Sequence, residues 1–363
     1  MKLVRPNPEQ LNTIVQALYA VASAAGTVAP IPVEIRSIEA IQRHMLQQDA
    51  PVAAAGGPLP DNLESALDTP ELRRLTVRLL MMLSVIDRRV RPEKVAVVEQ
   101  AARRLGIEDR GLGILRRAAR GQNKRIALTL MKTFVDWWSP SGKAGLRDWG
   151  RFLWWMLPQL HGAGTARKNR EMLARYQGLA KLPEGTFGHT LYRFYADHEI
   201  ALPGAPKSVP WIMHEVYHVI SEYGVALEAE LLLTAFVGGT QEETCMDQIL
   251  FGLLSYQAGR QIVGGVISEG LLDPEDYFRA MARGARIQVD LVHGWDFWAV
   301  AEVDMAELRA RYNLPPISER ERRKVGGYNG LLTGSGHSTP ADATPGPFAP
   351  GPLDSGPLEP AAA

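Results

Sequence analysis

Two histidines and two glutamates in the middle of the chain carry the clearest chemical pattern. His214 and His218 stand four residues apart with Glu215 between them, and Glu230 follows twelve residues after the second histidine. On a helix, residues four apart lie about 40° apart around the axis and about 6 Å along it. The two imidazoles can therefore converge on one divalent metal ion.

Glu230 reaches the same ion only if the chain turns back. On one straight helix it would lie about 18 Å beyond His218, whereas metal–ligand bonds are about 2 Å long. Tyr223 and Gly224 offer a place for the turn, because glycine tolerates the left-handed conformation that ends helices. We expect a bend near residue 224, followed by a second helix from about Ala226 that carries Glu230 back to the histidines.

Two histidines and a carboxylate with open coordination positions suit either zinc or iron(II), and the sequence leaves this choice open. Such an ion acts as a Lewis acid, and iron also engages dioxygen. We expect Glu215 either to move protons beside the metal or to serve as a fourth ligand.

His-Glu-x-x-His is also the signature of the zincin metalloproteases, in which the glutamate is the general base. We rank this alternative second for two reasons. Strand patterns are nearly absent around the motif, and the eleven-residue interval before Glu230 is short for the third ligand of such a protease.

Composition restricts the class of protein. The chain has 363 residues, of which 46% are hydrophobic, and this share excludes a wholly disordered chain. The single cysteine, Cys245, excludes an intramolecular disulfide framework and a cysteine-built zinc ribbon. No segment fits a membrane span or a signal peptide. We expect a cytoplasmic protein that is either soluble or peripheral on the inner face of the membrane.

The charges balance overall but not locally. The 40 basic and 40 acidic side chains cancel, so no overall charge attracts nucleic acid, and we expect no nucleic-acid partner. Residues 71–125, however, hold 15 basic and 6 acidic side chains, and residues 184–247 hold 2 basic and 10 acidic ones. Separate functions and solvated helix faces explain these two segments equally well.

Helical periodicity runs through nearly the whole chain, so we predict an all-α fold. Asn7 and Pro8 are typical of a helix start. Apolar residues recur at three- and four-residue steps over residues 72–86 and again over residues 95–105, where Gly106 is placed to end the helix. The tail at 333–363 holds seven prolines and is predicted to be disordered.

The segment 72–121 resembles the TerB-like helical domain of tellurite-resistance proteins. An apolar helix ends at Asp87, and after a short turn Glu93 opens the next helix. Arg88 stands where that family tends to have glycine. We therefore favour a helical adaptor, in which Asp87 and Glu93 cap helices, over an acidic metal site.

Residues 137–155 are crowded with aromatic side chains. Amphipathic aromatics beside cations are typical of a lipid-contacting helix at a membrane surface. They are also typical of a packed core with snorkelling arginines, and both interpretations stay open. The aromatic residues are Trp137, Trp138, Trp149, Phe152, Trp154 and Trp155, and the cations among them are Lys143, Arg147 and Arg151.

The metal motif belongs to a longer stretch, residues 214–241, that strongly resembles the hallmark of the coenzyme Q (ubiquinone) biosynthesis protein four family. The family pattern is His-Asp-x-x-His, eleven residues, then Glu. His214, His218 and Glu230 match it by identity, and Glu215 replaces the aspartate. Similarity upstream and downstream extends the resemblance over residues 181–316.

This resemblance implies a helical protein with a metal at His214, Glu215, His218 and Glu230, beside an apolar tunnel for a polyprenyl tail. The implied activity is metal-dependent oxidative decarboxylation or hydroxylation of a prenylated aromatic head group in ubiquinone biosynthesis. The alternative is a non-catalytic scaffold that binds quinone intermediates and presents them to other biosynthetic enzymes. A closed four-ligand site would favour the scaffold, and an open coordination position would favour catalysis.

Polar residues within the apolar runs are the candidate substrate-binding residues: Tyr217, Tyr256 and Arg260. The apolar residues themselves fit either a tunnel or an ordinary helical core. They are Leu231, Leu232, Leu233, Phe236, Ile249, Phe251, Leu253 and Leu254.

We expect a multi-helix, metal-binding domain preceded by a smaller, TerB-like helical domain, and a homo-oligomer stays open. The predicted parts are N-terminal helices and a linker (1–60), the TerB-like domain (61–135), aromatic-rich connector helices (136–180), the metal- and lipid-binding domain (181–316) and the disordered tail (333–363).

Overall fold

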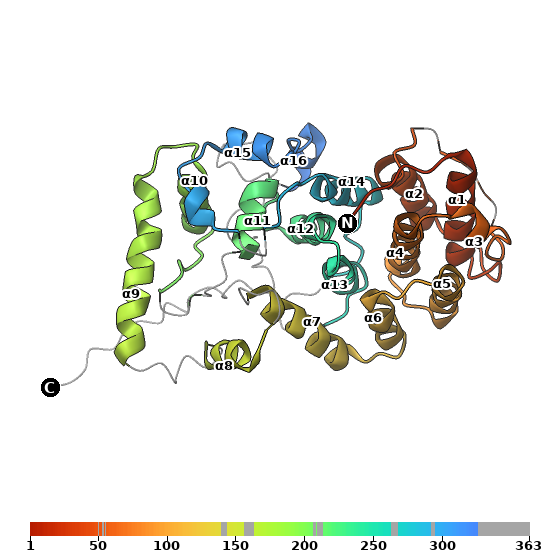
Figure 1. Cartoon of the computed structure of the whole chain (residues 1–363), viewed down its shortest axis with the longest axis horizontal. Coiled ribbons are helices and arrows are strands. Elements are labelled where there is room, and N and C mark those ends of the chain that lie inside the picture. Colours follow the sequence, from red (N-terminus) through yellow and green to blue (C-terminus); the bar gives the residue numbers. More distant parts are fainter. Residues whose placement is uncertain are drawn as a thin grey trace.

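The computed structural model of the chain is built from helices (Figure 1). In the part of the chain that it describes there is no β-sheet, and the only strand-like pairings are two isolated bridges, Thr186–Asp304 and Ala258–Glu269. The predicted all-α fold is confirmed, whereas the predicted disordered tail lies outside the described residues. The described residues are 1–49, 51–52, 54, 56–138, 144–155, 163–205, 208, 213–262, 268–291 and 295–325.

The helices fall into two groups along the chain. The first group is α1 (Pro8–Ala22), α2 (Pro32–Ala40), η1 (Ile41–Met45), α3 (Leu63–Ala66), α4 (Pro70–Ile86), α5 (Pro92–Leu105), α6 (Arg110–Ala119), α7 (Asn123–Trp138) and α8 (Leu146–Trp155). The second group is α9 (Ala163–Gly178), η3 (Leu179–Lys181), α10 (Phe187–Asp197), α11 (Met213–Ser221), α12 (Leu227–Thr240), α13 (Cys245–Gly252), η4 (Leu253–Gln257), α14 (Pro274–Ala285), η5 (Phe297–Val300), α15 (Met305–Arg311) and α16 (Glu319–Val325).

Local signals set several helix ends as predicted. The Asn7 side chain accepts a hydrogen bond from the Gln10 backbone N–H at 2.9 Å, and the Gln10 side chain accepts one from the Asn7 backbone N–H at 2.9 Å. This reciprocal capping box satisfies two donors that the start of α1 leaves free. Gly106 takes a left-handed conformation, with φ of 66°, and ends α5.

The N-terminal helices pack directly on the helices that follow (Figure 1). Helix α2 and the π-turn η1 lie against α14, α6 and α7 lie against α13, and α4 contacts both α13 and η4. One apolar core runs through both groups, from Ile14 and Leu80 to Phe236 and Phe278. The domain boundaries stay a prediction.

Basic residues of the segment 71–125 contact acidic residues of the segment 184–247 where the first group of helices packs on the second. The guanidinium of Arg78 donates to Asp109 at 3.0 Å and to the side chain of Glu242 at 2.8 Å. Arg110 pairs with Asp247 at 3.2 Å. Part of the basic excess in residues 71–125 is therefore neutralised by the acidic excess in residues 184–247.

Asp87 is neutralised by cations of its own segment. The buried ammonium of Lys94 bonds to Asp87 at 2.7 Å and to the buried carboxylate of Glu34, and Arg91 bonds to Asp87 at 3.2 Å. Glu93 is exposed in the first turn of α5. The Asp87 carboxylate is therefore engaged in ion pairs, and the helical-adaptor interpretation stays a prediction.

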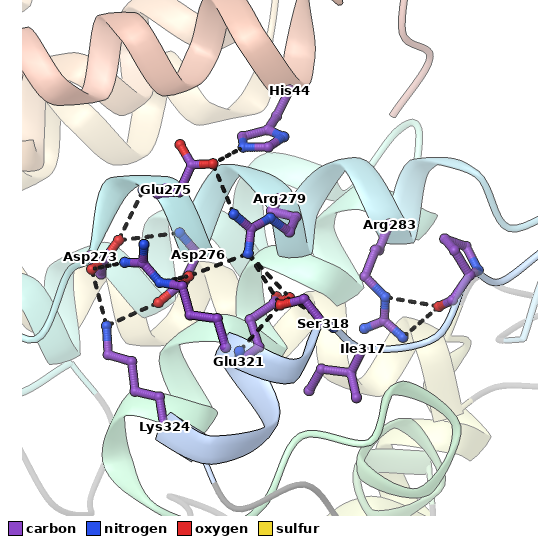
Figure 2. A network of polar contacts seen from close by, with 12 residues as sticks. His44, Asp273, Glu275, Asp276, Arg279, Arg283, Ile317, Ser318, Glu321 and Lys324 are labelled. Carbon is purple, nitrogen blue, oxygen red and sulfur yellow. Dashed lines mark hydrogen bonds and ion pairs between the residues drawn. The ribbon is translucent and has the colours of Figure 1, made fainter.

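A polar network ties α14 to its neighbours (Figure 2). Glu275 lies 2.8 Å from the His44 ring nitrogen of η1 and accepts a hydrogen bond from Arg279 at 2.8 Å. Arg279 also reaches Glu321 of α16 at 3.5 Å. Lys324 bonds to Asp276 at 3.0 Å, which anchors α16 against α14 a second time.

The aromatic-rich connector is described in part. Trp149 and Phe152 of α8 meet edge to face, with ring centroids 6.1 Å apart. The side chains of Trp137, Trp138, Trp154 and Trp155 lie outside the part of the structure that is described. Among the described helices, none combines the length and the apolar character needed to cross a bilayer.

Helices α12 and α14 cross at very close range because glycines line the crossing. A Cβ built on Gly284 would lie 2.0 Å from the Phe236 carbonyl oxygen, and one built on Gly239 would lie 2.2 Å from the Met281 carbonyl oxygen. Neither backbone oxygen can move without displacing its own helix. The crossing therefore fixes α12, the helix that carries Glu230.

The first prediction concerns this crossing. Gly284→Ala should lower the free energy of unfolding by about 2 to 3 kcal/mol, because the added methyl group must push two helices apart. Gly178→Ala is the matched control, since nothing lies within 4 Å of its Cβ position. This control should be neutral or stabilising by up to about 1 kcal/mol. Urea unfolding measures both variants, and equal stability of the two would contradict the close crossing.

Candidate metal centre

His214, His218 and Glu230 come together as the spacing predicts. The two Nε2 atoms lie 3.0 Å apart, and the Glu230 carboxylate oxygens lie 3.6 Å from His214 Nε2 and 3.4 Å from His218 Nε2. The three ligand atoms all lie within 4.8 Å of one another. His218 and Glu230 are almost fully buried, and His214 forms the more accessible edge of the group.

The bend that returns Glu230 to the histidines is confirmed, but its left-handed residue is not the glycine. Helix α11 ends at Ser221, Glu222 has φ of 67°, and α12 begins after its N-cap Ala226. Gly224 does not have a positive φ. The expectation that Gly224 carries the left-handed conformation is therefore wrong. A residue with a β-carbon takes this conformation only where other interactions offset the strain.

Three arginines surround the Glu222 carboxylate and supply that stabilisation. Glu222 lies 3.3 Å from Arg322, 3.7 Å from Arg309 and 3.9 Å from Arg283, and it accepts a hydrogen bond from the Ile317 backbone N–H at 3.2 Å. The carboxylate is nearly inaccessible to solvent. A buried charge of this kind is stable only because it is paired.

Two of these arginines also cap the end of α11. Arg283 donates to the Ser221 carbonyl at 3.0 Å, and Arg309 donates to the Val219 carbonyl at 3.0 Å and to the Ile220 carbonyl at 3.2 Å. A helix C-terminus leaves such carbonyls without partners. Figure 2 shows Arg283 on α14, where it also reaches the backbone oxygen of Pro315.

The bend also fixes the tautomer of His218. Its Nδ1 lies 3.0 Å from the Tyr223 carbonyl oxygen, which only accepts hydrogen bonds, so Nδ1 carries the proton. The Nε2 lone pair then faces His214 and Glu230. This arrangement is the one in which a backbone carbonyl orients a metal-binding histidine. The ring of Phe194, on α10, stacks on the imidazole ring of His218, with centroids 5.3 Å apart.

Charges within the group favour an ionised glutamate. Burial alone would raise the pKa of Glu230, but the facing His218 and His214 outweigh it and lower this pKa to about 2. Burial likewise opposes a charge on His214, and the negative charge of Glu230 overrides it and raises the His214 pKa to about 9. Glu230 Oε1 has no hydrogen-bond partner among the described residues although it is fully buried.

A divalent metal ion fits these three groups. Two ligand atoms bound at about 2.1 Å are about 3.0 Å apart at a right angle and about 3.4 Å apart at the tetrahedral angle. The observed separations of 3.0, 3.4 and 3.6 Å lie close to this range. Such an ion would bind Glu230 Oε1, which has no hydrogen-bond partner among the described residues, and the lone pair on His218 Nε2.

Glu215 lies beside the triad rather than in it. No carboxylate oxygen of Glu215 belongs to the group of ligand atoms within 4.8 Å of one another. The side chain is only 4% exposed, and its Oε2 has no hydrogen-bond partner among the described residues. Burial raises the pKa of Glu215 and of the nearby Tyr195, and the charge of Glu215 adds to the shift of Tyr195.

Of the three candidate substrate-binding residues, Tyr256 is the one whose pKa responds to the triad. Burial raises the pKa of Tyr256, and the negative charge of Glu230 raises it further. The Tyr256 hydroxyl has no hydrogen-bond partner within the described part of the chain.

Tyr217 and Arg260 point elsewhere. Tyr217 lies edge-on to Phe236 at 6.4 Å, and its hydroxyl lies near Thr240 at the last turn of α12. That turn is about 15 Å along the helix from Glu230. Arg260 donates to the Ala118 carbonyl of α6 at 2.6 Å. A head-group role for either residue stays a prediction.

The sequence alone did not identify Phe194 or the arginines of the bend. Arg283 shares its face of α14 with the charged Asp276 and Arg279, so nothing in the sequence singled it out. The apolar residues proposed for a tunnel are all buried in the common core, and the tunnel itself stays a prediction.

Comparisons with protein-family models, with curated proteins and with solved structures find no match to this chain.

The second prediction tests the bend. Glu222→Ala should lower the free energy of unfolding by about 3 to 5 kcal/mol, because it leaves buried arginines without their carboxylate. Glu222→Gly loses the same carboxylate but relieves the left-handed strain, so it should be about 1 kcal/mol more stable than the alanine variant. Urea unfolding measures both. Equal losses would show that the left-handed conformation costs nothing.

Proposed function

We propose that this chain binds one divalent metal ion, zinc or iron(II), at His214, His218 and Glu230 and acts on the aromatic head group of an isoprenoid lipid. The proposed reaction is oxidative decarboxylation or hydroxylation of a prenylated aromatic acid, as the resemblance to the coenzyme Q (ubiquinone) biosynthesis protein four family implies. The observation that carries the proposal is the three-ligand group built by α11 and α12 around the bend.

The number of ligands supports a reactive site. Structural zinc sites are closed by four protein ligands, whereas catalytic sites keep a position open. Here the ligand atoms of three residues lie within 4.8 Å of one another, and Glu215 contributes no atom to this group. When bound, the ion supplies Lewis-acid polarisation and, in the case of iron(II), one-electron chemistry with dioxygen.

Two unpartnered polar groups whose pKa values respond to the triad support binding of a polar head group. Buried polar atoms normally have hydrogen-bond partners. Glu215 Oε2 and the Tyr256 hydroxyl have none among the described residues. In the proposed function Tyr256 donates a hydrogen bond to an oxygen of the aromatic ring, and Glu215 takes up or delivers a proton beside it.

The overall change replaces the ring carboxyl group by a hydroxyl group. The bond from the ring to the carboxyl carbon breaks and releases carbon dioxide, and a bond from the same ring carbon to oxygen forms. Dioxygen is the oxidant, its second oxygen atom leaves as water, and an external two-electron donor supplies the remaining electrons. The contribution of the chain is to orient the ring and to move the protons.

The scaffold function is the second candidate, in which the protein binds quinone intermediates, presents them to other biosynthetic enzymes and does no chemistry. The same apolar core would serve both functions. The zincin alternative has less support, because the described residues form no sheet whose edge would hold a peptide substrate.

The third prediction is the metal content. Protein purified without added metal should contain about one equivalent of zinc or iron by mass spectrometry. His214→Ala, His218→Ala and Glu230→Ala should each lose at least about nine tenths of it, because a two-ligand site binds far more weakly. His189→Ala on α10 is the matched control and should keep its metal. Full metal in the His218→Ala variant would place the ion elsewhere.

The fourth prediction separates the enzyme from the scaffold. Aerobic incubation of the metal-loaded protein with a prenylated 4-hydroxybenzoate and a reductant should release carbon dioxide. Glu215→Gln should keep the metal and lower the rate by about 100-fold, because proton transfer is lost while the ligands stay. Equal rates for the two proteins would remove the role of Glu215.

Absence of carbon dioxide with either metal, together with a quinone-type lipid that copurifies in extracts, would favour the scaffold. Cleavage of an unfolded protein substrate that depends on Glu215 would instead favour the zincin alternative.

A further inference from the structure

Helices α6 to α8 carry an excess of positive charge that the metal centre does not use. Residues 110–155 contain ten basic and two acidic side chains. Both acids are already engaged with backbone: Asp136 accepts from the Ala144 N–H at 2.8 Å, and Asp148 accepts from the Gly145 N–H at 3.1 Å. The three helices follow one another along the lower edge of the molecule in Figure 1.

The exposed side of α7 combines cations with a leucine. Lys124, Leu128 and Lys132 recur at four-residue steps, and Arg125 lies next to them, so all four fall within about 100° around the axis. Leu128 is 65% exposed. The acid at the next four-residue step, Asp136, accepts a hydrogen bond from the Ala144 backbone N–H. The opposite side of α7 is buried through Ile126, Leu130 and Thr133. The stripe ends before the buried Val135, which falls on the same side of the helix as Leu128.

Helix α8 repeats the pattern. Leu146 is 94% exposed and Leu153 is 54% exposed, and the exposed Arg147 lies beside them. On another side of the same helix, the side chain of Phe152 is buried. Six large apolar side chains are exposed in the described residues, and half of them, Leu128, Leu146 and Leu153, lie on α7 and α8.

A groove between α5, α6 and α7 adds a site for an anionic group. It has a volume of about 730 Å³, and four arginines and three acidic residues lie in its walls. Two of the acids are already paired, Asp109 with Arg78 and Glu99 with Arg116, and the third is Glu108. Arg117 donates to the Thr129 hydroxyl at 3.3 Å. Within the described residues, no carboxylate lies within ion-pair distance of Arg103 or Arg117, although the neighbouring Arg116 pairs with Glu99.

We propose that α6, α7 and α8 form a docking face for a bilayer that contains anionic lipids. Leu128, Leu146 and Leu153 enter the interface, the surrounding lysines and arginines meet lipid phosphates, and the groove beside Arg103 and Arg117 receives one phosphate group. Exposed leucines flanked by cations are what an interfacial helix requires.

Other occupants fit this face less well. Two copies of the chain facing each other through it would bring like charges together, which is unfavourable. Nucleic acid would use the cations but would leave the leucines exposed. Docking on a bilayer needs neither a bound metal nor catalysis, so the docking face and the proposed function can fail independently of each other.

Vesicle flotation of the full chain tests the face. The protein should float with vesicles of phosphatidylcholine and phosphatidylglycerol and much less with phosphatidylcholine alone, and binding should weaken as salt rises. Leu146→Glu/Leu153→Glu should lower the partition coefficient about tenfold or more, because two apolar anchors become charged. Both positions are exposed, so the fold should persist, and circular dichroism checks it.

Met172→Glu on α9 is the matched control, since Met172 is 38% exposed and lies outside the docking face. It should float like the unmodified chain. Should the double variant be unstable, Leu128→Glu gives the same test on α7. Equal flotation of all variants overturns the proposal. A shift in oligomeric state by size-exclusion chromatography, without a change in flotation, shows instead that the leucines form an interface between copies and also overturns it.

The groove is tested separately with Arg103→Ala/Arg117→Ala. This variant should lose about threefold or more of its binding to anionic vesicles and keep its weak binding to neutral ones. Inorganic phosphate that competes with vesicles for the unmodified chain, but not for this variant, supports a phosphate in the groove. Unchanged binding by the variant overturns the groove as part of the face.

Discussion

The candidate site depends on one hydrogen bond, between His218 Nδ1 and the carbonyl of Tyr223. This bond sets the tautomer of the imidazole, and it exists because the chain reverses at Glu222. The reversal in turn requires a left-handed residue with a β-carbon, held by a buried cluster of arginines. The same reversal returns Glu230 to the histidines. The orientation of the His218 ring and the position of the Glu230 carboxylate therefore both follow from the conformation of Glu222.

Helices that lie outside the bend hold the left-handed conformation of Glu222 in place. Arg283 belongs to α14, whose glycine crossing with α12 leaves no room for a shift. Helix α14 is held by η1 through His44 and by α16 through Glu321 (Figure 2). The N-terminal helices therefore contribute to the rigidity of the site, although none of their residues lies in the triad.

Much of the site could be predicted because its geometry is local. Four-residue spacing on a helix brings His214 to His218 whatever surrounds them, and helix length alone requires the turn before Glu230. The residue that takes the left-handed conformation could not be predicted, because the arginines that stabilise Glu222 lie 61 or more positions later in the sequence. The same limit applies to Tyr217 and Arg260, whose polarity was visible but whose directions depend on long-range packing.

The central claim is that His214, His218 and Glu230 bind one metal ion together. X-ray absorption spectroscopy at the metal edge of the zinc- or iron-loaded protein tests it most directly. We predict two imidazole nitrogens and a carboxylate oxygen at about 2.0 to 2.2 Å from the metal. The imidazole contribution should fall by half in His218→Ala protein reconstituted with excess metal. A spectrum of oxygen ligands only, unchanged by that substitution, would contradict it.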